Sequence, residues 1–389
     1  MRRLVLAWVI LVAALSPALA GSKGWEKLRP QLVELARQNQ NGALQAYQYA
    51  LSVSGPDAWD ARFLAGFIAF RMLNRPDVAA QHFAEQAMLS KDAYGKSMAG
   101  FWLGRALAAV GRKDDAEKAW KAAAQWTHTF YGQVAAARLG KGFTIATDPS
   151  AAFSAMDVTE VLATAEGRRI AAAQAAGDVR ARDEALLRLA GGSTKEMAIA
   201  CAMAVRTGAV DIAVDIARQA AKRGIALVEC GWPQVNPKWH DQRVPREWVL
   251  AVSREESTFK QNSVSSANAK GQMQVTDGAA LEVGKIANVP INLGMVRANA
   301  DYNVAVGSFY LAEMFKAWGN HPVLALAAYN AGSKRVEDWI ARFGDPRAGQ
   351  IDVVDWIESI PFEETRSYVK KVTASALVYM AQSQRASAK

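Results

Sequence analysis

Residues 245–259 read PREWVLAVSREESTF, and they predict a helix that carries two adjacent acids near its end. Proline suits the first turn of a helix because its backbone nitrogen has no hydrogen to donate. At about 100° per residue the apolar side chains share one face, made of Trp248, Val249, Val252 and Phe259. Glu255 and Glu256 fall at the two margins of that face, so the helical period does not choose between them.

A carboxylate at the edge of an apolar face near a helix C-terminus is poorly solvated and meets the negative end of the helix dipole. Both effects favour the protonated form, which a general acid at neutral pH requires. The alternative is that Glu255 or Glu256 is a rim residue paired with Arg254 or Lys260.

A polar loop and a further motif follow this helix. Asn262, Ser263, Ser265, Ser266 and Asn268 lead into the block Gly271-Gln272-Met273-Gln274, and Ala328-Tyr329-Asn330-Ala331-Gly332 comes later. Amides and hydroxyls supply both donors and acceptors, which neutral sugars and N-acetyl groups demand. One carboxylate, an amide-rich loop and a tyrosine therefore indicate a site that cleaves a sugar polymer without a metal or a cofactor.

The segment from about residue 25 to 230 is predicted to be all helix, since it is rich in alanine and its apolar residues recur at helical spacing. A shift of 37 residues aligns Arg75, Asp77, Ala79, Phe83 and Ala87 with Arg112, Asp114, Ala116, Trp120 and Ala124. This period is typical of helix-hairpin solenoids. We interpret the aromatic residues as packing residues that small alanines face, namely Phe67, Phe70, Phe83, Trp102 and Trp120.

The composition changes between Cys230 and Pro245, where glycine and proline crowd together and a helix cannot continue. This change predicts a helical superhelix domain over residues 21–232 and a second domain over residues 240–389. Two domains also suit the length of 389 residues, because such a chain exceeds what one hydrophobic core usually supports. The second domain has fewer alanines and more polar and aromatic residues, as expected of a domain that carries a polar cleft.

Residues 1–20 predict a secretory signal peptide, with an apolar stretch after Arg2-Arg3 and the cleavage pattern Ala18-Leu19-Ala20. The stretch is shorter than the roughly 20 apolar residues of a membrane anchor. We therefore expect a periplasmic protein with no transmembrane anchor after cleavage. Loss of the two arginines lowers the formal charge from +9 to +7. A basic charge suits an anionic envelope polymer, although an excess of this size also serves solubility.

The cysteines and histidines argue against several other kinds of site. Cys201 and Cys230 provide neither a disulfide framework nor zinc spacing, and export permits them to pair without forcing it. The four histidines are scattered singly and leave a nucleophilic triad without its base. No dinucleotide fingerprint is present, and the basic residues are dispersed rather than clustered. We therefore expect no metal, no cofactor and no nucleic-acid partner.

Four ordered motifs resemble the soluble lytic murein transglycosylase family. They are Glu256-Ser257 followed by Ser265, Gly-x-Met-Gln at 271–274, Ala-Tyr-Asn-Ala-Gly at 328–332, and Glu364-Thr365-Arg366-x-Tyr368-Val369. The resemblance covers about residues 240–385, and Trp126 to Gly140 is similar to the last hairpins of that family's superhelix. It implies an all-α chain, with an N-terminal α-superhelical domain of helix hairpins followed by a C-terminal lysozyme-like helical catalytic domain.

The resemblance also implies roles for individual residues. The glutamate of the Glu-Ser motif is the catalytic acid, which selects Glu256 over Glu255. The residues implied to bind substrate are Ser265, Met273 and Gln274 near the sugar being cleaved, Tyr329 and Asn330 beside the acid, and Glu364 and Tyr368 on the opposite wall. We expect Tyr329 to donate a hydrogen bond to Glu256. Three positions depart from the family's usual pattern: Asn268, Gln272 and the pair Thr276-Asp277.

The implied reaction cleaves the β-1,4 bond between N-acetylmuramic acid and N-acetylglucosamine in peptidoglycan and leaves a 1,6-anhydromuramic acid end. Glycoside hydrolases normally use two carboxylates, whereas these motifs supply one. A goose-type lysozyme-like hydrolase that uses water is one alternative. A non-catalytic envelope scaffold that only binds glycan strands is the other.

Overall fold

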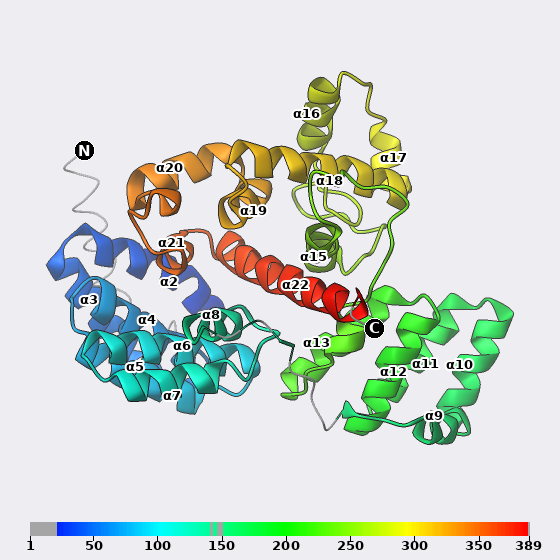
Figure 1. Cartoon of the computed structure of the whole chain (residues 1–389), viewed down its shortest axis with the longest axis horizontal. Coiled ribbons are helices and arrows are strands. Elements are labelled where there is room, and N and C mark those ends of the chain that lie inside the picture. Colours follow the sequence, from blue (N-terminus) through cyan, green and yellow to red (C-terminus); the bar gives the residue numbers. More distant parts are fainter. Residues whose placement is uncertain (1–21, 141, 143, 146–150, 388–389) are drawn as a thin grey trace. The chain divides into compact units, whose positions relative to one another are not determined.

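The computed structural model describes residues 22–140, 142, 144–145 and 151–387, and these residues are predominantly helical (Figure 1). The predicted signal peptide lies outside them. Within them, strand-like pairing is confined to isolated bridges that join Val264 to Lys270 and Lys270 to Val275. The expected all-α fold class is therefore confirmed. None of the described helices combines the length and the apolar character needed to cross a membrane.

The chain divides into two compact units, which we describe separately. The first comprises Met1–Trp126, Tyr131–Gly142 and Pro361–Glu363, and the second comprises Thr127–Phe130, Phe143–Ile360 and Glu364–Lys389. The domain boundary predicted between residues 232 and 240 lies inside the second unit. It stays a proposal about domain organisation.

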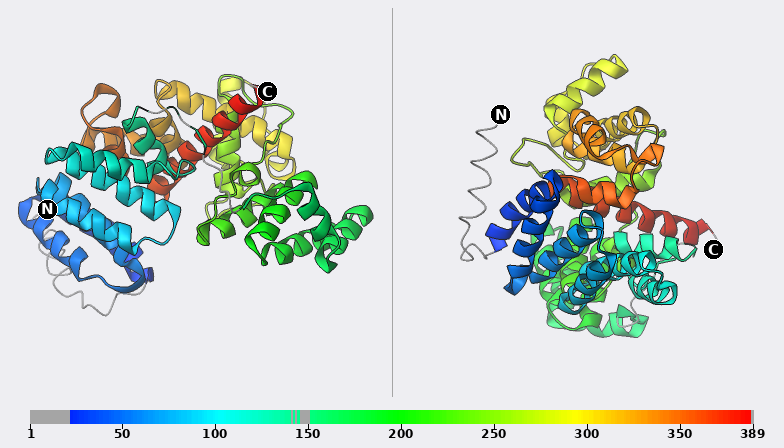
Figure 2. Two further views of the ribbon diagram at one scale, coloured as in Figure 1. Left: turned by 60° about the horizontal axis from the view of Figure 1, so that its bottom comes forward. Right: turned by 90° about the vertical axis from the view of Figure 1, so that its left-hand side faces the viewer.

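The first unit is a stack of helix hairpins in which consecutive helices from α4 to α7 pack side by side (Figures 1 and 2). Its helices are α2 (Ser22–Gln38), α3 (Gln40–Ser52), η2 (Gly55–Asp57), α4 (Ala58–Arg71), α5 (Pro76–Leu89), α6 (Ala93–Ala109), α7 (Lys113–Ala123) and nearly all of α8 (Phe130–Arg138).

Close helix packing in this stack also depends on glycines that lie against the large rings. A Cβ atom added to Gly66 on α4 would lie 2.6 Å from the ring of Phe83 on α5. One added to Gly104 on α6 would lie 2.3 Å from the ring of Trp120 on α7. The two hairpins thus repeat the same contact, and even one methyl group would force the helices apart.

Four of the five predicted packing residues form an aromatic cluster, in which Phe67, Phe70 and Phe83 surround Trp102, and Trp120 packs near Leu107. Phe67, Phe83 and Trp102 are buried, whereas Phe70 and Trp120 are partly exposed. The ring centroids of Phe67 and Trp102 are 5.4 Å apart in an edge-to-face arrangement, which is a favoured geometry for aromatic pairs. Packing accounts for these rings without a ligand.

The second unit contains a further stack of helices followed by a compact helical domain. Its helices are α9 (Ala155–Leu162), α10 (Ala165–Ala176), α11 (Val179–Ala190), α12 (Thr194–Arg206), α13 (Val210–Lys222), α14 (Val228–Gly231), α15 (Arg246–Ser257), α16 (Asp277–Ala287), α17 (Leu293–Ala298), α18 (Ala300–Ala317), α19 (Pro322–Ala331), α20 (Ser333–Phe343), η4 (Pro346–Ala348), α21 (Val353–Ser359) and α22 (Glu363–Ser387). Trp248, Trp318 and Trp339 are buried in it, as expected of core residues.

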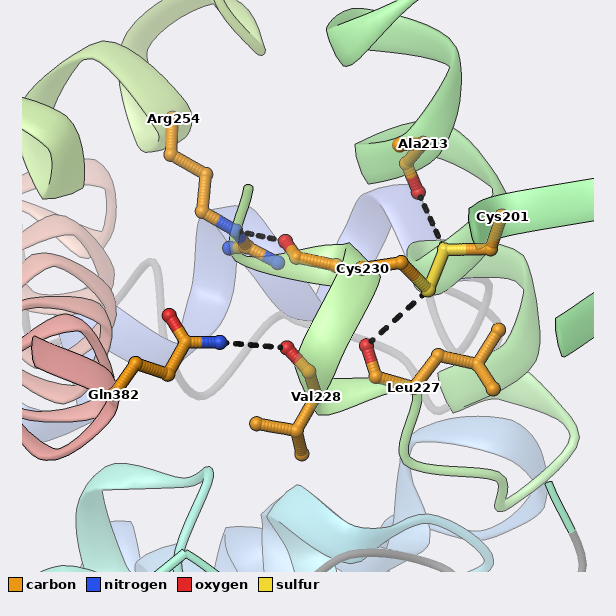
Figure 3. Close-up of a disulfide and its surroundings, with 8 residues drawn as sticks. Cys201, Ala213, Leu227, Val228, Cys230, Arg254 and Gln382 are labelled. Atoms are coloured by element: carbon orange, nitrogen blue, oxygen red, sulfur yellow. Dashed lines mark hydrogen bonds between the residues drawn. A yellow bond between two sulfur atoms is a disulfide. The ribbon is translucent and has the colours of Figure 1, made fainter. Parts of the chain in front are cut away.

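A disulfide joins Cys201 on α12 to Cys230 on α14 (Figure 3). It closes the hairpin stack onto the short segment that leads to α15. Arg254 of α15 reaches this segment, where its Nε donates to the carbonyl of Gly231 over 2.8 Å. The disulfide therefore fixes one of the attachment points of the helix that carries the two acids.

We expect the double variant Cys201→Ser with Cys230→Ser to lose roughly 3 kcal/mol of stability, because the cross-link restricts the unfolded chain. The two cysteines have a sequence separation of 29, so the closed loop is of substantial size. Urea unfolding of both proteins measures this loss. Reductant should lower the midpoint of the natural protein and leave that of the variant unchanged. Equal midpoints without reductant would contradict the prediction.

Candidate active site

Helix α15 ends at Ser257, two residues before the end that the sequence predicts. Thr258 and Phe259 adopt left-handed backbone conformations, with φ angles of 54° and 63°. Such angles are unusual for residues other than glycine, and for a β-branched threonine in particular. The amide of Thr258 still bonds to the carbonyl of Arg254 over 3.1 Å, so the chain turns sharply away directly after the two acids.

The structure gives Glu255 a network of partners that marks it as an ionised carboxylate. It forms ion pairs with Arg254 and with Arg218, whose Nη2 lies 3.3 Å from its Oε2. The hydroxyl of Ser375 donates to its Oε1 over 2.7 Å. Burial works against the charged form, but the positive charges of Arg254 and Arg218 prevail and hold the pKa of Glu255 below its ordinary value.

Glu256 has the opposite environment. Burial raises the pKa of its carboxyl to about 8, and the negative charges of Glu364 and Glu255 add to the rise, since each of these effects disfavours the ionised form. The Tyr368 hydroxyl lowers this pKa because it lies close to Glu256, although it makes no hydrogen bond of standard geometry within the described part of the chain. Glu256 is therefore largely protonated at neutral pH. The neighbouring acids thus differ in charge state, a distinction that helical periodicity alone could not make.

Tyr329 on α19 supports the loop at residues 271–274. Its hydroxyl donates to the carbonyl of Met273 over 2.8 Å, so the predicted bond to Glu256 is not formed. Tyr329 is nevertheless close to the acid, because burial together with the negative charge of Glu256 raises the pKa of its phenol well above the ordinary value. Its ring lies 5.4 Å from that of Tyr310, measured between centroids.

Asn303 on α18 holds the same loop. Its side chain is fully buried. Its Oδ1 accepts from the amide of Met273 over 2.9 Å. Its Nδ2 donates to the carbonyl of Lys270 over 2.8 Å and to that of Val296 over 3.0 Å. Gly271 crosses this side chain so closely that an added Cβ would lie 2.3 Å from Nδ2.

Sequence reasoning missed Asn303, although one signal was present. A lone asparagine within an apolar helical run needs several partners when buried. Gly307, one turn later on α18, was also missed. A Cβ added there would lie 2.7 Å from Cβ of Met273, so this glycine lets the loop pack directly on the helix.

The substrate residues implied by the resemblance occupy different depths around this loop. Met273 is fully buried, and its amide and carbonyl already bond to Asn303 and Tyr329, so it supports the loop from inside. Gln274 has a φ of 47°, and its amide donates to the carbonyl of Gly271 over 2.9 Å. Ser265 is exposed, and its hydroxyl accepts from the amide of Ala269 over 3.1 Å.

Asn330, expected beside the acid, comes from α19, and Glu364 and Tyr368, expected on the opposite wall, come from the start of α22. Asn330 is partly exposed, and its Oδ1 accepts from the hydroxyl of Thr365 over 2.6 Å. Glu364 is exposed, whereas Tyr368 is buried. Glu364 and Tyr368 both influence the pKa of Glu256, so both lie within electrostatic reach of that carboxyl.

Two of the three departures from the family pattern, at Asn268 and at Thr276-Asp277, have local explanations. Asn268 adopts a left-handed conformation with a φ of 61°, which asparagine tolerates better than most residues. Thr276 is the N-cap of α16, and its hydroxyl accepts from the amide of Ala279 over 3.2 Å, as is usual for a capping threonine. Asp277 pairs with Lys270. Within the described residues, no group of three or more histidine, cysteine or acidic side chains could hold a metal ion.

Comparison with known proteins agrees with the motifs and with this geometry. Residues 235–350 match the family model of the "Transglycosylase SLT domain". Over this segment the chain is similar to the transglycosylase SLT domain. The soluble lytic murein transglycosylase of Escherichia coli strain K12 is 35% identical over 140 residues, which are 36% of this chain and 21% of that protein. The chain thus spans about a fifth of the length of that relative.

Two solved structures show the same fold across nearly all of the chain. The 70 kDa soluble lytic transglycosylase of Escherichia coli has a TM-score of 0.59 at 21% identity and covers 96% of this chain and 64% of that one. An inactive mutant of lytic transglycosylase Slt from Pseudomonas aeruginosa has a TM-score of 0.58 at 21% identity, with coverages of 98% and 68%. The expected superhelix followed by a lysozyme-like domain is thereby confirmed as a fold.

We expect Asn303→Asp to lose roughly 2–5 kcal/mol, because it keeps the side-chain shape but leaves two buried carbonyls facing an acceptor, at about 1–3 kcal/mol each. Urea unfolding measures the loss. Asn299→Asp at the N-cap of the same helix is the control, since the Asn299 side chain accepts a bond from the amide of Tyr302, which aspartate can also accept. Equal losses in the two variants would contradict the assigned role.

The raised pKa of Glu256 predicts a stability that depends on pH. The folded chain binds this proton more tightly than the unfolded chain, whose value is near 4.5. The resulting stabilisation is complete below about pH 4.5 and is lost as the pH rises through about 8. Each pKa unit between the folded and the unfolded chain corresponds to about 1.4 kcal/mol of stability. Glu256→Gln stays neutral, so it should match the natural protein at low pH and exceed it by roughly 2–5 kcal/mol at pH 9.

Urea unfolding between about pH 4.5 and 9 measures this difference. Glu255→Gln is the control, and it should destabilise the chain across the whole range because Glu255 is ionised and paired. A Glu256→Gln variant that is less stable at pH 9 than the natural protein would show that Glu256 is not held neutral.

Proposed function

We propose that this protein is a peptidoglycan lytic transglycosylase. It cleaves the β-1,4 bond between N-acetylmuramic acid and N-acetylglucosamine and forms 1,6-anhydromuramic acid ends. The observation that carries the proposal is the division of charge between the adjacent acids, since Glu256 is kept protonated while Glu255 is paired and ionised. The names of the relatives and the matched SLT domain support the same activity.

One acid suffices for this reaction. Protonated Glu256 donates its proton to the glycosidic oxygen, and the bond from that oxygen to the anomeric carbon of the muramic acid breaks. The resulting carboxylate accepts the proton of the sugar's own C6 hydroxyl, whose oxygen attacks the anomeric carbon. Glu256 is thereby restored. Proton transfer by a positioned side chain contributes about 100- to 10,000-fold to such a rate.

Intramolecular attack makes a second catalytic carboxylate unnecessary. A well-oriented internal nucleophile can lower a barrier by about 7–11 kcal/mol relative to a free one. Glu255 is unsuited to activating water because Arg254, Arg218 and Ser375 already occupy its oxygens. The alternative hydrolase has one supporting feature, the exposed carboxylate of Glu364 near Glu256, which could activate water on the other side of the sugar.

The loop and the helix ends supply groups suited to a neutral sugar. We propose that Gln274 and Asn330 present amides to the sugar beside Glu256, and that Ser265 contacts it at the exposed edge of the loop. Glu364 and Tyr368 flank the acid from α22. Tyr329 and Met273 contribute by fixing the backbone that presents these groups.

We propose that the protein acts in the periplasm. The N-terminal sequence predicts export, and the chain holds a disulfide between Cys201 and Cys230, a kind of bond that persists in oxidising compartments. The substrate is then the peptidoglycan glycan strand.

The proposal is tested by incubating the purified chain with peptidoglycan sacculi and measuring the ends of the released fragments by mass spectrometry. Anhydro ends are lighter than reducing ends by one water. Glu256→Gln should reduce release at least 1,000-fold, on the order of the contribution of a catalytic proton donor. Glu255→Gln should cost much less at its own optimal pH.

Fragments with reducing ends only would favour the hydrolase and implicate Glu364. Glycan binding without any release by the natural chain would favour the non-catalytic scaffold. Full release by folded Glu256→Gln would refute the assignment of the acid.

A further inference from the structure

Glu255 takes no direct part in the proposed reaction, yet three helices of the second unit hold it. Arg254 pairs with it from α15, Arg218 from α13 and Ser375 from α22. The side chain of Glu255 is only 7% exposed. A buried charge is retained only where its partners compensate for the loss of water, which this arrangement does.

The partners of Glu255 are themselves fixed. The guanidinium of Arg254 lies over the ring of Trp232, 4.1 Å from its centroid, and also bonds to Gly231 beside the disulfide (Figure 3). The indole of Trp232 donates to Ser375 over 3.0 Å. Arg254, Trp232, Ser375 and Glu255 therefore form a closed ring of contacts, which we call the Glu255 network.

Arg218, the remaining partner of Glu255, also fixes the last turn of α15. Arg218 donates to the carbonyl of Arg254 over 3.2 Å, and a cation at this point offsets the negative end of the helix dipole. At the other end of α15, Glu247 accepts from Ser383 over 2.8 Å. Glu247 and Glu255 are eight residues apart, as are Ser375 and Ser383, so α15 and α22 run antiparallel and are joined at both ends.

We propose that Glu255 is a positioning residue that anchors the last turn of α15 between α13 and α22 and keeps a permanent negative charge beside Glu256. This inference rests on the proposed function. The charge favours the protonated acid, while the anchoring fixes the direction in which that acid points.

The charged and titratable groups around Glu255 and Glu256 determine in which direction each substitution shifts the ionisation of Glu256. Glu256 faces Tyr368 and Glu364 of α22 and Tyr329 of α19. Glu255 faces Arg254 and Arg218, and also Lys371 and Tyr379 of α22. Removing the charge of Glu255 leaves these cations uncompensated, which favours the ionised form of Glu256. Removing the charge of Arg218 has no such effect.

The test is the pH profile of kcat/KM on sacculi for purified full-length variants. Activity should fall at high pH as Glu256 loses its proton. Glu255→Gln should move the midpoint of this fall down by roughly one pH unit, because a neighbouring unit charge contributes on that scale. Arg218→Gln should leave the midpoint in place or move it up. Glu247→Gln, the same substitution at the far end of α15, should leave the profile unchanged.

A purely structural role for Glu255 predicts a different pattern, in which Glu255→Gln lowers the rate at every pH and leaves the midpoint unchanged. That result would overturn the inference, as would a downward shift in Arg218→Gln. Complete loss of activity in folded Glu255→Gln would also overturn it, because the residue would then act directly. If Glu255→Gln does not fold, Arg218→Gln still tests the inference, because Glu255 keeps Arg254 in that variant: an upward shift of the midpoint supports the inference and a downward shift overturns it.

A second measurement separates this inference from the proposed function. The effect of Glu256→Gln on unfolding, followed against pH, reports the ionisation of Glu256 without any turnover. When Glu256→Gln is made in a chain that already carries Glu255→Gln, its effect on unfolding should appear at a lower pH. The midpoint of this effect should shift down by the same amount as the midpoint of the activity profile. An unshifted midpoint would overturn the inference even if the chain cleaves sacculi, whereas a chain without turnover would still test it.

Discussion

The site depends on two adjacent carboxyl groups, at the end of one helix, that lie in environments favouring opposite charge states. Two neighbouring negative charges that are both largely withdrawn from water would repel each other and lose hydration. The fold resolves this by supplying cations and a hydroxyl to Glu255, while burial and the neighbouring acids disfavour the ionised form of Glu256. The arrangement explains why helices as distant in sequence as α13 and α22 both reach the end of α15.

The proposed site also requires a rigid backbone in the loop at residues 271–274. Asn303, Tyr329 and the hydroxyl of Ser257 fix carbonyl and amide groups of the loop at residues 271–274. Gly271 and Gln274 adopt positive φ angles there, and such conformations persist where the surroundings hold them in place. The amide of Gln274 also donates to the carbonyls of Gly271 and Ser263, so it is held in one orientation on this fixed backbone.

Local pattern was sufficient for much of the fold and for the region of the site. The helices, the buried face of α15 with Trp248, and the repeat at Phe83 and Trp120 all follow from periodicity, which reports the side of a helix that is buried. Periodicity does not report what lies opposite that side. The pairing of the cysteines, the glycines under the two rings and the partners of Glu255 depend on contacts between segments far apart in sequence.

The two tyrosines show that a sequence motif also fails to predict the partner of a single hydrogen bond. Tyr329 and Tyr368 both lie near Glu256, and a motif gives their position but not the direction of their hydroxyl groups. The bond from Tyr329 goes to a backbone carbonyl, which leaves the Tyr368 hydroxyl as the polar group close to the acid. A neutral carboxyl needs few such partners. A strong hydrogen bond to Glu256 would stabilise the carboxylate and weaken the acid, so a sparse polar environment is consistent with its proposed role as a proton donor.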